Sequence, residues 1–194
     1  NNSAPSSFFL PLDRIERALR QLQNDEAVTR GTLQTTFRSE PYDELRRLGL
    51  TDDSERLVRE AFPEQTGMLT VDQVIPGSAA SEVLEPGDIL IRIDGELVTQ
   101  FVPLGAVLDS KVGEEIDVQV ERGGRRIEAA IRVDDLHAIT PDEYLEFGDA
   151  IVNQLSYQQA RHYNRSVTGV YVANPGYILS RAAIPRGAVI TEMD

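Results

Sequence analysis

The sequence predicts an α+β fold built as two tandem units, of which the second is incomplete. Short helical and strand patterns alternate along the chain, with Gly and Pro turns between them. One pattern, a short helix, a Pro/Gly turn and an apolar strand ending in Asp, occurs twice, at 76–95 and 175–194. Within it Gly87 matches Gly187, one hundred residues later. This period is too long for a solenoid and suits tandem domains.

Composition argues against several classes of function. The net charge of −13 and the pI near 4.6 disfavour direct binding to nucleic acid or to anionic membranes. The same charge favours basic peptides, although solubility is the simpler reason for it. The absence of Cys excludes a disulfide scaffold, a thiol nucleophile and a Cys-ligated metal site. Because the chain starts at Asn1 without Met or a signal-peptide pattern, we expect it to be a piece of a longer protein.

The first elements are a strand and a helix. A short apolar run at 8–12 predicts one buried strand. Asp13 is expected to cap the next helix, with Glu16 completing a capping box. The helix is expected to end near 24–25. Its apolar face is expected to pack on the first unit or on a preceding domain, and this face consists of Ile15, Ala18, Leu19 and Leu22.

The body of the first unit consists of strands and short helices. A β-branched stretch at 32–38 predicts a strand, and 68–75 predicts another. Pro41 begins a short helix that Gly49 is placed to end. A further helix runs between a cap at 51–54 and Pro63.

After the first repeat, turn signals organise the rest of this unit. Asp94-Gly95 predicts a tight hairpin turn, and a helix is expected at 103–111. Alternating polarity on both sides of Gly123-Gly124 predicts a second hairpin, formed by 116–121 and 126–133. The unit is therefore complete by about Asp135.

The second unit is expected to begin with a helix. Thr140 to Glu143 has Pro at the first helical position and Glu in reach of a capping box. Strands are expected at 150–155 and 170–173, with a helix capped by Ser156 and Gln159 between them. The counterparts of the elements that come after Asp94 are expected beyond Asp194.

Several stretches resemble the region that follows the protease domain in HtrA-like serine proteases. Residues 8–14 resemble the last protease strand and its linker, and Arg30-Gly31 resembles the start of HtrA PDZ domains. Residues 42–50 resemble the next helix, 76–95 the heart of a PDZ domain, and 140–164 the opening of the second PDZ domain in the fungal nuclear, pro-apoptotic subfamily. The resemblance implies a circularly permuted, partly open PDZ-like β-barrel or sandwich with short helices, in tandem with a truncated second PDZ-like unit.

The resemblance also implies a division of the chain and a compartment. Residues 1–12 would end the protease domain, 13–29 would form the linker helix, 30–135 the first PDZ domain and 136–194 an incomplete second one. The compartment would be the nucleus, with the cytoplasm as an alternative.

No catalytic site is expected in this chain. The family places its nucleophile in a Gly-Asn-Ser-Gly-Gly turn, which is absent, and there is no Gly-x-Ser-x-Gly elbow. A Ser-His-Asp triad needs three groups within hydrogen-bond reach, whereas the two histidines, His137 and His162, are isolated. We expect no cofactor and no metal site.

PDZ domains bind an extended peptide as an added strand beside a sheet edge. The resemblance places the peptide-binding residues in two segments: Gly31, Thr32, Leu33, Gln34 and Thr35 in the loop, and Leu104, Val107 and Leu108 on the helix. The helical residues share one face, which could equally be core. Gln34 stands where the family has glycine, and a side chain there opposes the backbone angles that aim the amides inward. Capture of a terminal carboxylate is therefore in doubt.

The leading interpretation is a peptide-recognition and regulatory PDZ region of an HtrA-type serine endopeptidase, with a role in protein quality control. Its partners would be C-termini or unfolded segments, its own protease domain and possibly a second copy, but neither nucleic acid nor membrane. One alternative is a non-catalytic PDZ scaffold. Another is a packing or oligomerisation module with a degenerate groove, which the Thr32 to Thr35 loop makes credible.

Overall fold

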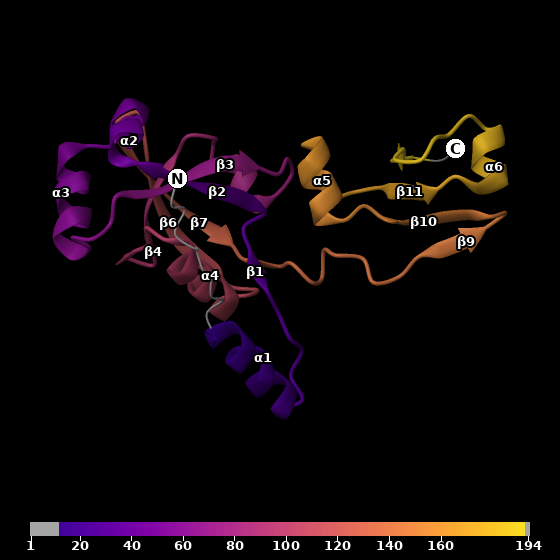
Figure 1. Cartoon of the computed structure of the whole chain (residues 1–194), viewed down its shortest axis with the longest axis horizontal. Helices are drawn as coiled ribbons and strands as arrows, with labels where there is room; N and C mark the ends of the chain where they lie inside the picture. The colour runs from indigo at the N-terminus through magenta and orange to yellow at the C-terminus, as the bar shows by residue number, and fades with distance from the viewer. Residues whose placement is uncertain (1–11, 193–194) are drawn as a thin grey trace, which may run out of the picture.

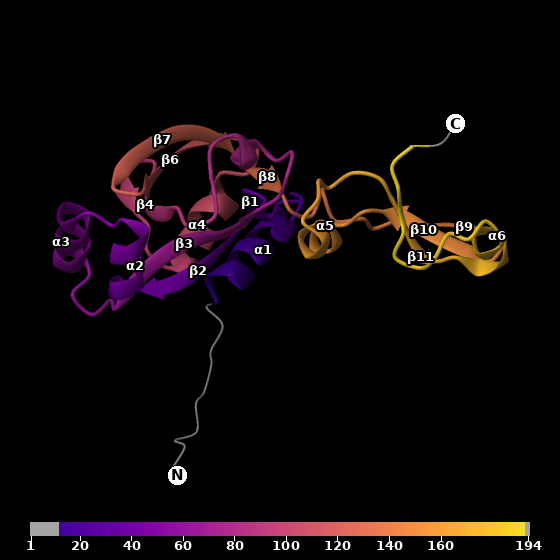
Figure 2. The same ribbon diagram turned by 90° about the horizontal axis from the view of Figure 1, so that it is seen from above.

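The computed structural model describes residues 12–192 as two α+β lobes joined by a connecting segment (Figure 1). The first lobe runs from α1 to β8 and the second from β9 to β12. The two views place α5 at the end of the second lobe nearest the first (Figures 1 and 2). Within these residues, no helix is both long enough and apolar enough to cross a membrane.

The first lobe is built on an open antiparallel sheet. Its strand order is β2-β3-β4-β6-β7, with the short β5 beside β4, and β1 pairs separately with β8. The bounds are β1 Gly31–Thr32, β2 Thr35–Pro41, β3 Gly67–Val74, β4 Ile89–Ile93, β5 Glu96–Leu97, β6 Glu115–Arg122, β7 Arg125–Arg132 and β8 Asp134–Asp135. One core lies between this sheet and α4 (Phe101–Ser110), and the other lies beneath α2 (Tyr42–Leu48) and α3 (Asp52–Ala61).

Local signals set most of the turns and caps as predicted. Gly49 ends α2 with a φ of 103°, and the Thr51 side chain accepts a hydrogen bond from the Ser54 amide at the start of α3. The hairpin turns at Asp94-Gly95 and Gly123-Gly124 have positive φ at both central residues, as tight hairpins need.

The predicted cap of α1 (Asp13–Gln23) is wrong. The residue before the helix is Leu12, whose own φ and ψ are already helical, and no side chain caps the amides there. Asp13 therefore lies inside the first turn, where its charge still interacts favourably with the helix dipole. The strand predicted at 8–12 falls, apart from Leu12, outside the described residues.

The second lobe has the sheet order β12-β11-β10-β9. Its elements are β9 Leu145–Phe147, β10 Ala150–Gln154, α5 Tyr157–Tyr163, β11 Val170–Asn174, α6 Gly176–Arg181 and β12 Val189–Ile190. The capping box of Ser156 and Gln159 is confirmed. On one side of its sheet lies a hollow of about 710 Å³, lined by residues that include Leu145, Val152, Val170 and Ile190.

The helix predicted from Thr140 is wrong. Residues 141–144 are not helical, and Leu145 to Phe147 instead pair with β10 through the turn Gly148-Asp149. A short helix with little apolar surface gains little from packing, so the backbone pairing of a hairpin outweighs its capping signals.

The internal repeat is confirmed by hydrogen bonds of the same pattern. In the first lobe the Gly87 amide donates to Val71 O and the Val71 amide donates to Asp88 O, both at 2.8 Å. In the second lobe the Gly187 amide donates to Val172 O and the Val172 amide donates to Ala188 O, both at 2.9 Å. Strands β10, β11 and β12 therefore correspond to β2, β3 and β4.

The lobes meet through a small polar contact. The Gln73 side-chain amide on β3 donates to Arg161 O at 2.9 Å and to Asn164 Oδ1 at 3.1 Å, at the end of α5. These two hydrogen bonds connect the end of α5 to the first-lobe sheet.

Candidate peptide-binding site

Strand β2 lies at the end of the first-lobe sheet and so has one unpaired edge. Val71 on β3 directs its amide and carbonyl toward the β3–β4 turn, where they bond Asp88 O and Gly87 N. Phe37 lies opposite Val71, so its own amide and carbonyl point away from β3, toward the free edge. Because this direction alternates from one residue to the next along a strand, the amide and carbonyl of Ser39 also point toward the free edge. The edge thus presents free donors and acceptors to an added strand.

The loop before β2 interrupts the strand predicted at 32–38. Leu33 and Gln34 belong to no strand, and Gln34 has a φ of 52°, in the left-handed region. The Gln34 amide donates to Thr32 Oγ1 at 2.9 Å, and the Gln34 side chain donates to Asp134 Oδ2 at 2.9 Å. Gln34 adopts a glycine-like conformation although its side chain opposes it, because these bonds hold it there.

The predicted site residues fall into two groups. Leu33, Leu104 and Leu108 are buried in one core cluster, and Val107 packs partly against it. Gly31, Gln34 and Thr35 lie at the surface end of that cluster, and Thr32 is 8% exposed. For Leu104 and Leu108, the interpretation as core residues is therefore correct.

Sequence reasoning missed the apolar residues that α4 exposes. Phe101 is 50% exposed and Val102 is 49% exposed, and the helix begins at Phe101 rather than at Pro103. Pro103 lies in the first turn, where the missing amide breaks no helical hydrogen bond. The sequence signal for these residues was the apolar pair Phe101-Val102 directly before Pro103, because proline is favoured in the first turn of a helix.

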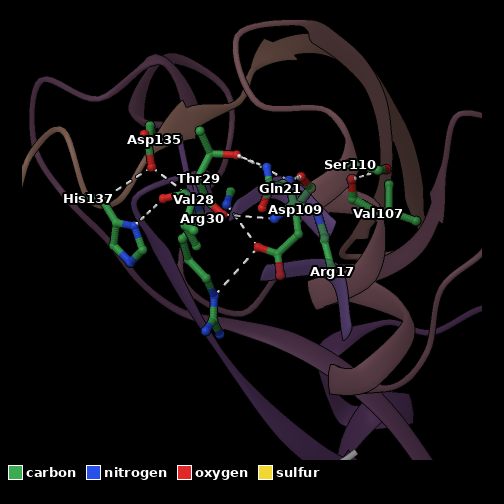
Figure 3. A network of polar contacts seen from close by, with 11 residues as sticks. Arg17, Gln21, Val28, Thr29, Arg30, Val107, Asp109, Ser110, Asp135 and His137 are labelled. Atoms are coloured by element: carbon green, nitrogen blue, oxygen red, sulfur yellow. Dashed lines mark hydrogen bonds and ion pairs between the residues drawn. The ribbon is translucent and has the colours of Figure 1, made fainter. Parts of the chain in front are cut away.

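A polar network joins the loop, α4 and α1 (Figure 3). The Asp109 side chain, 5% exposed, accepts a hydrogen bond from the Gly31 amide at 2.9 Å and lies 3.5 Å from Arg30 Nε. Arg17 on α1 donates to the carbonyl oxygens of Asp109 and Thr29. An acidic residue at a helix C-terminus opposes the helix dipole, so these donors are needed to stabilise Asp109.

Helix α1 docks through its polar side rather than its apolar face. Arg17 and Gln21 both bond Thr29, whereas Ile15, Leu19 and Leu22 are 60%, 52% and 62% exposed. Of the two partners expected for this apolar face, the first unit is therefore wrong, and packing on a preceding domain stays a prediction.

Two substitutions in α1 should separate the contribution of its polar contacts from that of its exposed apolar side chains. We expect Leu19→Ala to change the free energy of unfolding by less than about 0.5 kcal/mol, because the side chain is already hydrated. Arg17→Ala should free α1 from the lobe, since charged hydrogen bonds contribute roughly 1.5–3 kcal/mol. Hydrogen exchange of the α1 amides measures both, and faster exchange in Leu19→Ala than in Arg17→Ala would contradict this arrangement.

The corresponding edge in the second lobe is already occupied. Strand β9 pairs antiparallel with the outer edge of β10, with Val152 opposite Leu145 and Ala150 opposite Phe147. Since β10 corresponds to β2, the chain itself occupies the position where a ligand strand would lie. Of the two lobes that the structure describes, the first alone has this edge open.

The histidines have structural contacts. His137 Nδ1 donates to Val28 O at 2.7 Å, and its amide donates to Asp135 Oδ1 at 3.0 Å, which fixes the start of the connecting segment (Figure 3). The His162 ring lies edge-on to Tyr163. Between residues 12 and 192 we find no cluster of three or more His, Asp or Glu placed to hold a metal ion.

Comparison with protein families identifies two matching segments. Residues 70–122 match the PDZ domain family, and 138–194 match the PDZ-like domain family. The first segment contains most of β3 together with β4 and α4, and the second contains the whole sheet of the second lobe.

Curated relatives match almost the whole chain. Protease Do-like 7 of Arabidopsis thaliana is 45% identical over 203 residues, which cover 99% of this chain and 18% of the relative. The pro-apoptotic serine protease NMA111 of Phaeosphaeria nodorum is 48% identical over 173 residues, covering 88% of this chain and 17% of the relative. The NMA111 protein of Aspergillus clavatus is 47% identical over 171 residues, which cover 88% of this chain and 17% of the relative. The chain thus spans about a sixth of these relatives' length.

A solved structure has the same fold. The structure of an AlgW variant, an HtrA-type protease solved with a decapeptide, aligns with a TM-score of 0.50 at 18% identity. The alignment covers 65% of this chain and 35% of that one.

Proposed function

Because this chain is a PDZ region closely similar to that of HtrA-like serine proteases, we propose that it recognises extended peptide segments. The peptide adds as a strand to the free edge of β2, beside α4. We assign 30–135 to the first PDZ domain, 136–194 to an incomplete second one, and 13–29 to the linker from a protease domain that ends near residue 12. The region itself does no chemistry and presents segments to that protease.

The observation that carries this proposal is the contrast between the two strand edges. β2 has a free edge and directs the main-chain groups of Phe37 and Ser39 outward, whereas β10 is covered by β9. Main-chain hydrogen bonds provide most of the affinity when a strand is added to a sheet. The peptide therefore binds to the first lobe.

Peptide chemistry can be inferred from the residues that border this edge. Helix α4 carries a single charged residue, the buried Asp109, and exposes Phe101 and Val102. Ligand side chains directed toward the helix are therefore apolar. The net charge of −13 favours basic residues at the positions that face solvent.

Ser39→Pro tests the edge directly. Proline removes the outward amide of Ser39 without removing a bond to β3, so the fold is retained. We expect a loss of affinity of roughly two- to tenfold for decapeptides selected from a random array, because one hydrogen bond contributes roughly 0.5–1.5 kcal/mol.

The matched control for this test is Gln154→Pro on β10, because Gln154 follows Val152 by two residues as Ser39 follows Phe37, and its amide likewise points away from the neighbouring strand β11. This control should leave peptide affinity unchanged. Equal affinity of Ser39→Pro and the unaltered protein, with the circular dichroism spectrum unchanged, would remove β2 from the site.

The exposed stripe of α1 supports a role in regulation. Ile15, Leu19 and Leu22 lie on the side of the helix that faces away from the lobe, while Arg17 connects α1 to Asp109 and hence to Gly31 at the loop. We propose that the stripe contacts the protease domain and that peptide binding alters this contact. Because relatives carry the pro-apoptotic name, we place the function in apoptosis and the compartment, as for the family resemblance, in the nucleus.

A further inference from the structure

We propose that the first lobe selects internal segments of extended chains over free C-termini, because the Thr32 hydroxyl occupies the amide that would hold a terminal carboxylate. The proposal rests on the function proposed above and names the class of segment bound. Thr32 then determines specificity through its bond to the loop amide, without contacting the ligand.

The geometry of the loop supports this role. A carboxylate is held in such loops by backbone amides that converge on its oxygens. Here the Gln34 amide donates to Thr32 Oγ1 at 2.9 Å, within the range of a good hydrogen bond. A hydroxyl of the protein thus supplies the acceptor that a ligand carboxylate would otherwise provide.

Further bonds keep the loop in this arrangement. The Gln34 carbonyl accepts from the Ile75 amide at 3.0 Å, and the Gln34 side chain donates to Asp134 at 2.9 Å. Thr35 Oγ1 donates to Leu33 O at 3.2 Å. With residue 34 fixed at its carbonyl and its side chain, Gln34 holds its position beside Thr32, and its amide stays within reach of the Thr32 hydroxyl.

Charge around the loop acts in the same direction. Asp134 contacts the Gln34 side chain, Asp135 accepts from the Arg30 amide, and Asp109 accepts from the Gly31 amide. Two cations lie nearby: Arg30, which is 3.5 Å from Asp109 and partly neutralised by it, and Arg17, which donates to the Asp109 carbonyl. A terminal carboxylate brought to this loop would add a fourth negative charge.

An internal segment needs neither a free loop amide nor a site that tolerates another negative charge. It offers only neutral main-chain groups to the edge at Phe37 and Ser39, and its chain continues past the loop without placing a charge there. Unfolded proteins contain many such segments, so this selectivity suits recognition of exposed chain rather than of finished C-termini.

Three forms of one peptide test the proposal. The tightest-binding decapeptide from the array is prepared as a free acid, as a C-terminal amide and with six further residues at its C-terminus. For the unaltered protein we expect the amide and the extended form to bind about threefold more tightly than the free acid, because only the free acid brings a negative charge to the loop. A free acid that binds at least as tightly as the amide would overturn the inference while leaving peptide binding intact, and no binding of any form would overturn both proposals.

Substitutions at the loop identify the cause. Thr32→Val keeps the branched shape but frees the Gln34 amide, so the free acid should bind about five to ten times more tightly than the amide. Thr32→Ser retains a hydroxyl and should behave as the unaltered protein.

Hydrogen exchange provides a readout that needs no ligand. The Gln34 amide should be protected in the unaltered protein and in Thr32→Ser, and should exchange at least tenfold faster in Thr32→Val. An unchanged acid-to-amide ratio together with unchanged protection in Thr32→Val would overturn the role of this hydroxyl.

Discussion

Gly31→Ala is expected to destabilise the first lobe by about 3 kcal/mol and to abolish peptide binding. A Cβ atom at position 31 would overlap the carbonyl of Leu108 and would crowd the Asp109 amide. Both are backbone atoms of α4, so they cannot rotate away as a side chain could. Relief requires the helix to move from the loop, which breaks the Gly31 amide to Asp109 hydrogen bond and displaces the residues before β2.

The matched control for this substitution is Gly105→Ala in the same helix. A Cβ there would meet only the guanidinium of Arg14, at the flexible end of an exposed side chain. Alanine is favoured over glycine in a helix by roughly 1 kcal/mol, so stability should be unchanged or slightly raised. Urea unfolding followed by circular dichroism compares the two variants, and equal effects would show that α4 is not held closely against Gly31.

Asp88→Ala is expected to destabilise the first lobe by about 3 kcal/mol, the lower end of the range for breaking a buried ion pair. The Asp88 side chain is fully buried and accepts two hydrogen bonds from Arg122, at 2.6 and 2.8 Å, and one from the Glu85 amide at 2.8 Å. These bonds raise the pKa of Arg122 above its ordinary value. Because the Arg122 side chain is 32% exposed, it can regain water when Asp88 is removed, which limits the loss.

The reverse substitution should be worse. Arg122→Ala leaves a carboxylate inside the protein with no cation beside it, and an unpaired buried charge is the costlier defect. The double variant should therefore be more stable than Arg122→Ala alone. Thermal unfolding of the three variants measures this order, and a strictly additive double variant would contradict a direct interaction. The repeat places Ala188 at the corresponding position, so the second lobe is built without this ion pair.

The two lobes differ in the strand edge that the proposed peptide recognition would use. Peptide recognition in the first lobe requires that the loop at Gly31, the helix α4 and the edge of β2 remain in register. The second lobe has the same strand order in β10, β11 and β12 but fills the corresponding edge with β9. The second lobe contacts the first lobe through the end of α5, at Gln73.

The sequence by itself determined the features that depend on neighbouring residues. The turn at Gly123-Gly124, the C-cap at Gly49 and the N-cap at Ser156 arise from backbone freedom and from side chains that reach amides two or three positions away. The repeat was also visible, because Gly87 and Gly187 must adopt the same left-handed conformation, with φ of 96° and 86°. These signals were enough to predict the α+β class and the PDZ-like pattern.

Tertiary structure decided the features that depend on distant partners. Thr140 to Glu143 has a sound helix start, yet Leu145 to Phe147 pair with β10 because the hairpin satisfies backbone groups that a short exposed helix would leave to water. Gln34 keeps a left-handed conformation because Asp134, one hundred residues away, holds its side chain. Helix α1 exposes its apolar face because Arg17 finds carbonyl acceptors on Thr29 and α4. Local sequence rules describe a segment's preferences, but the free energy that overrides them comes from bonds and burial that only the folded chain brings together.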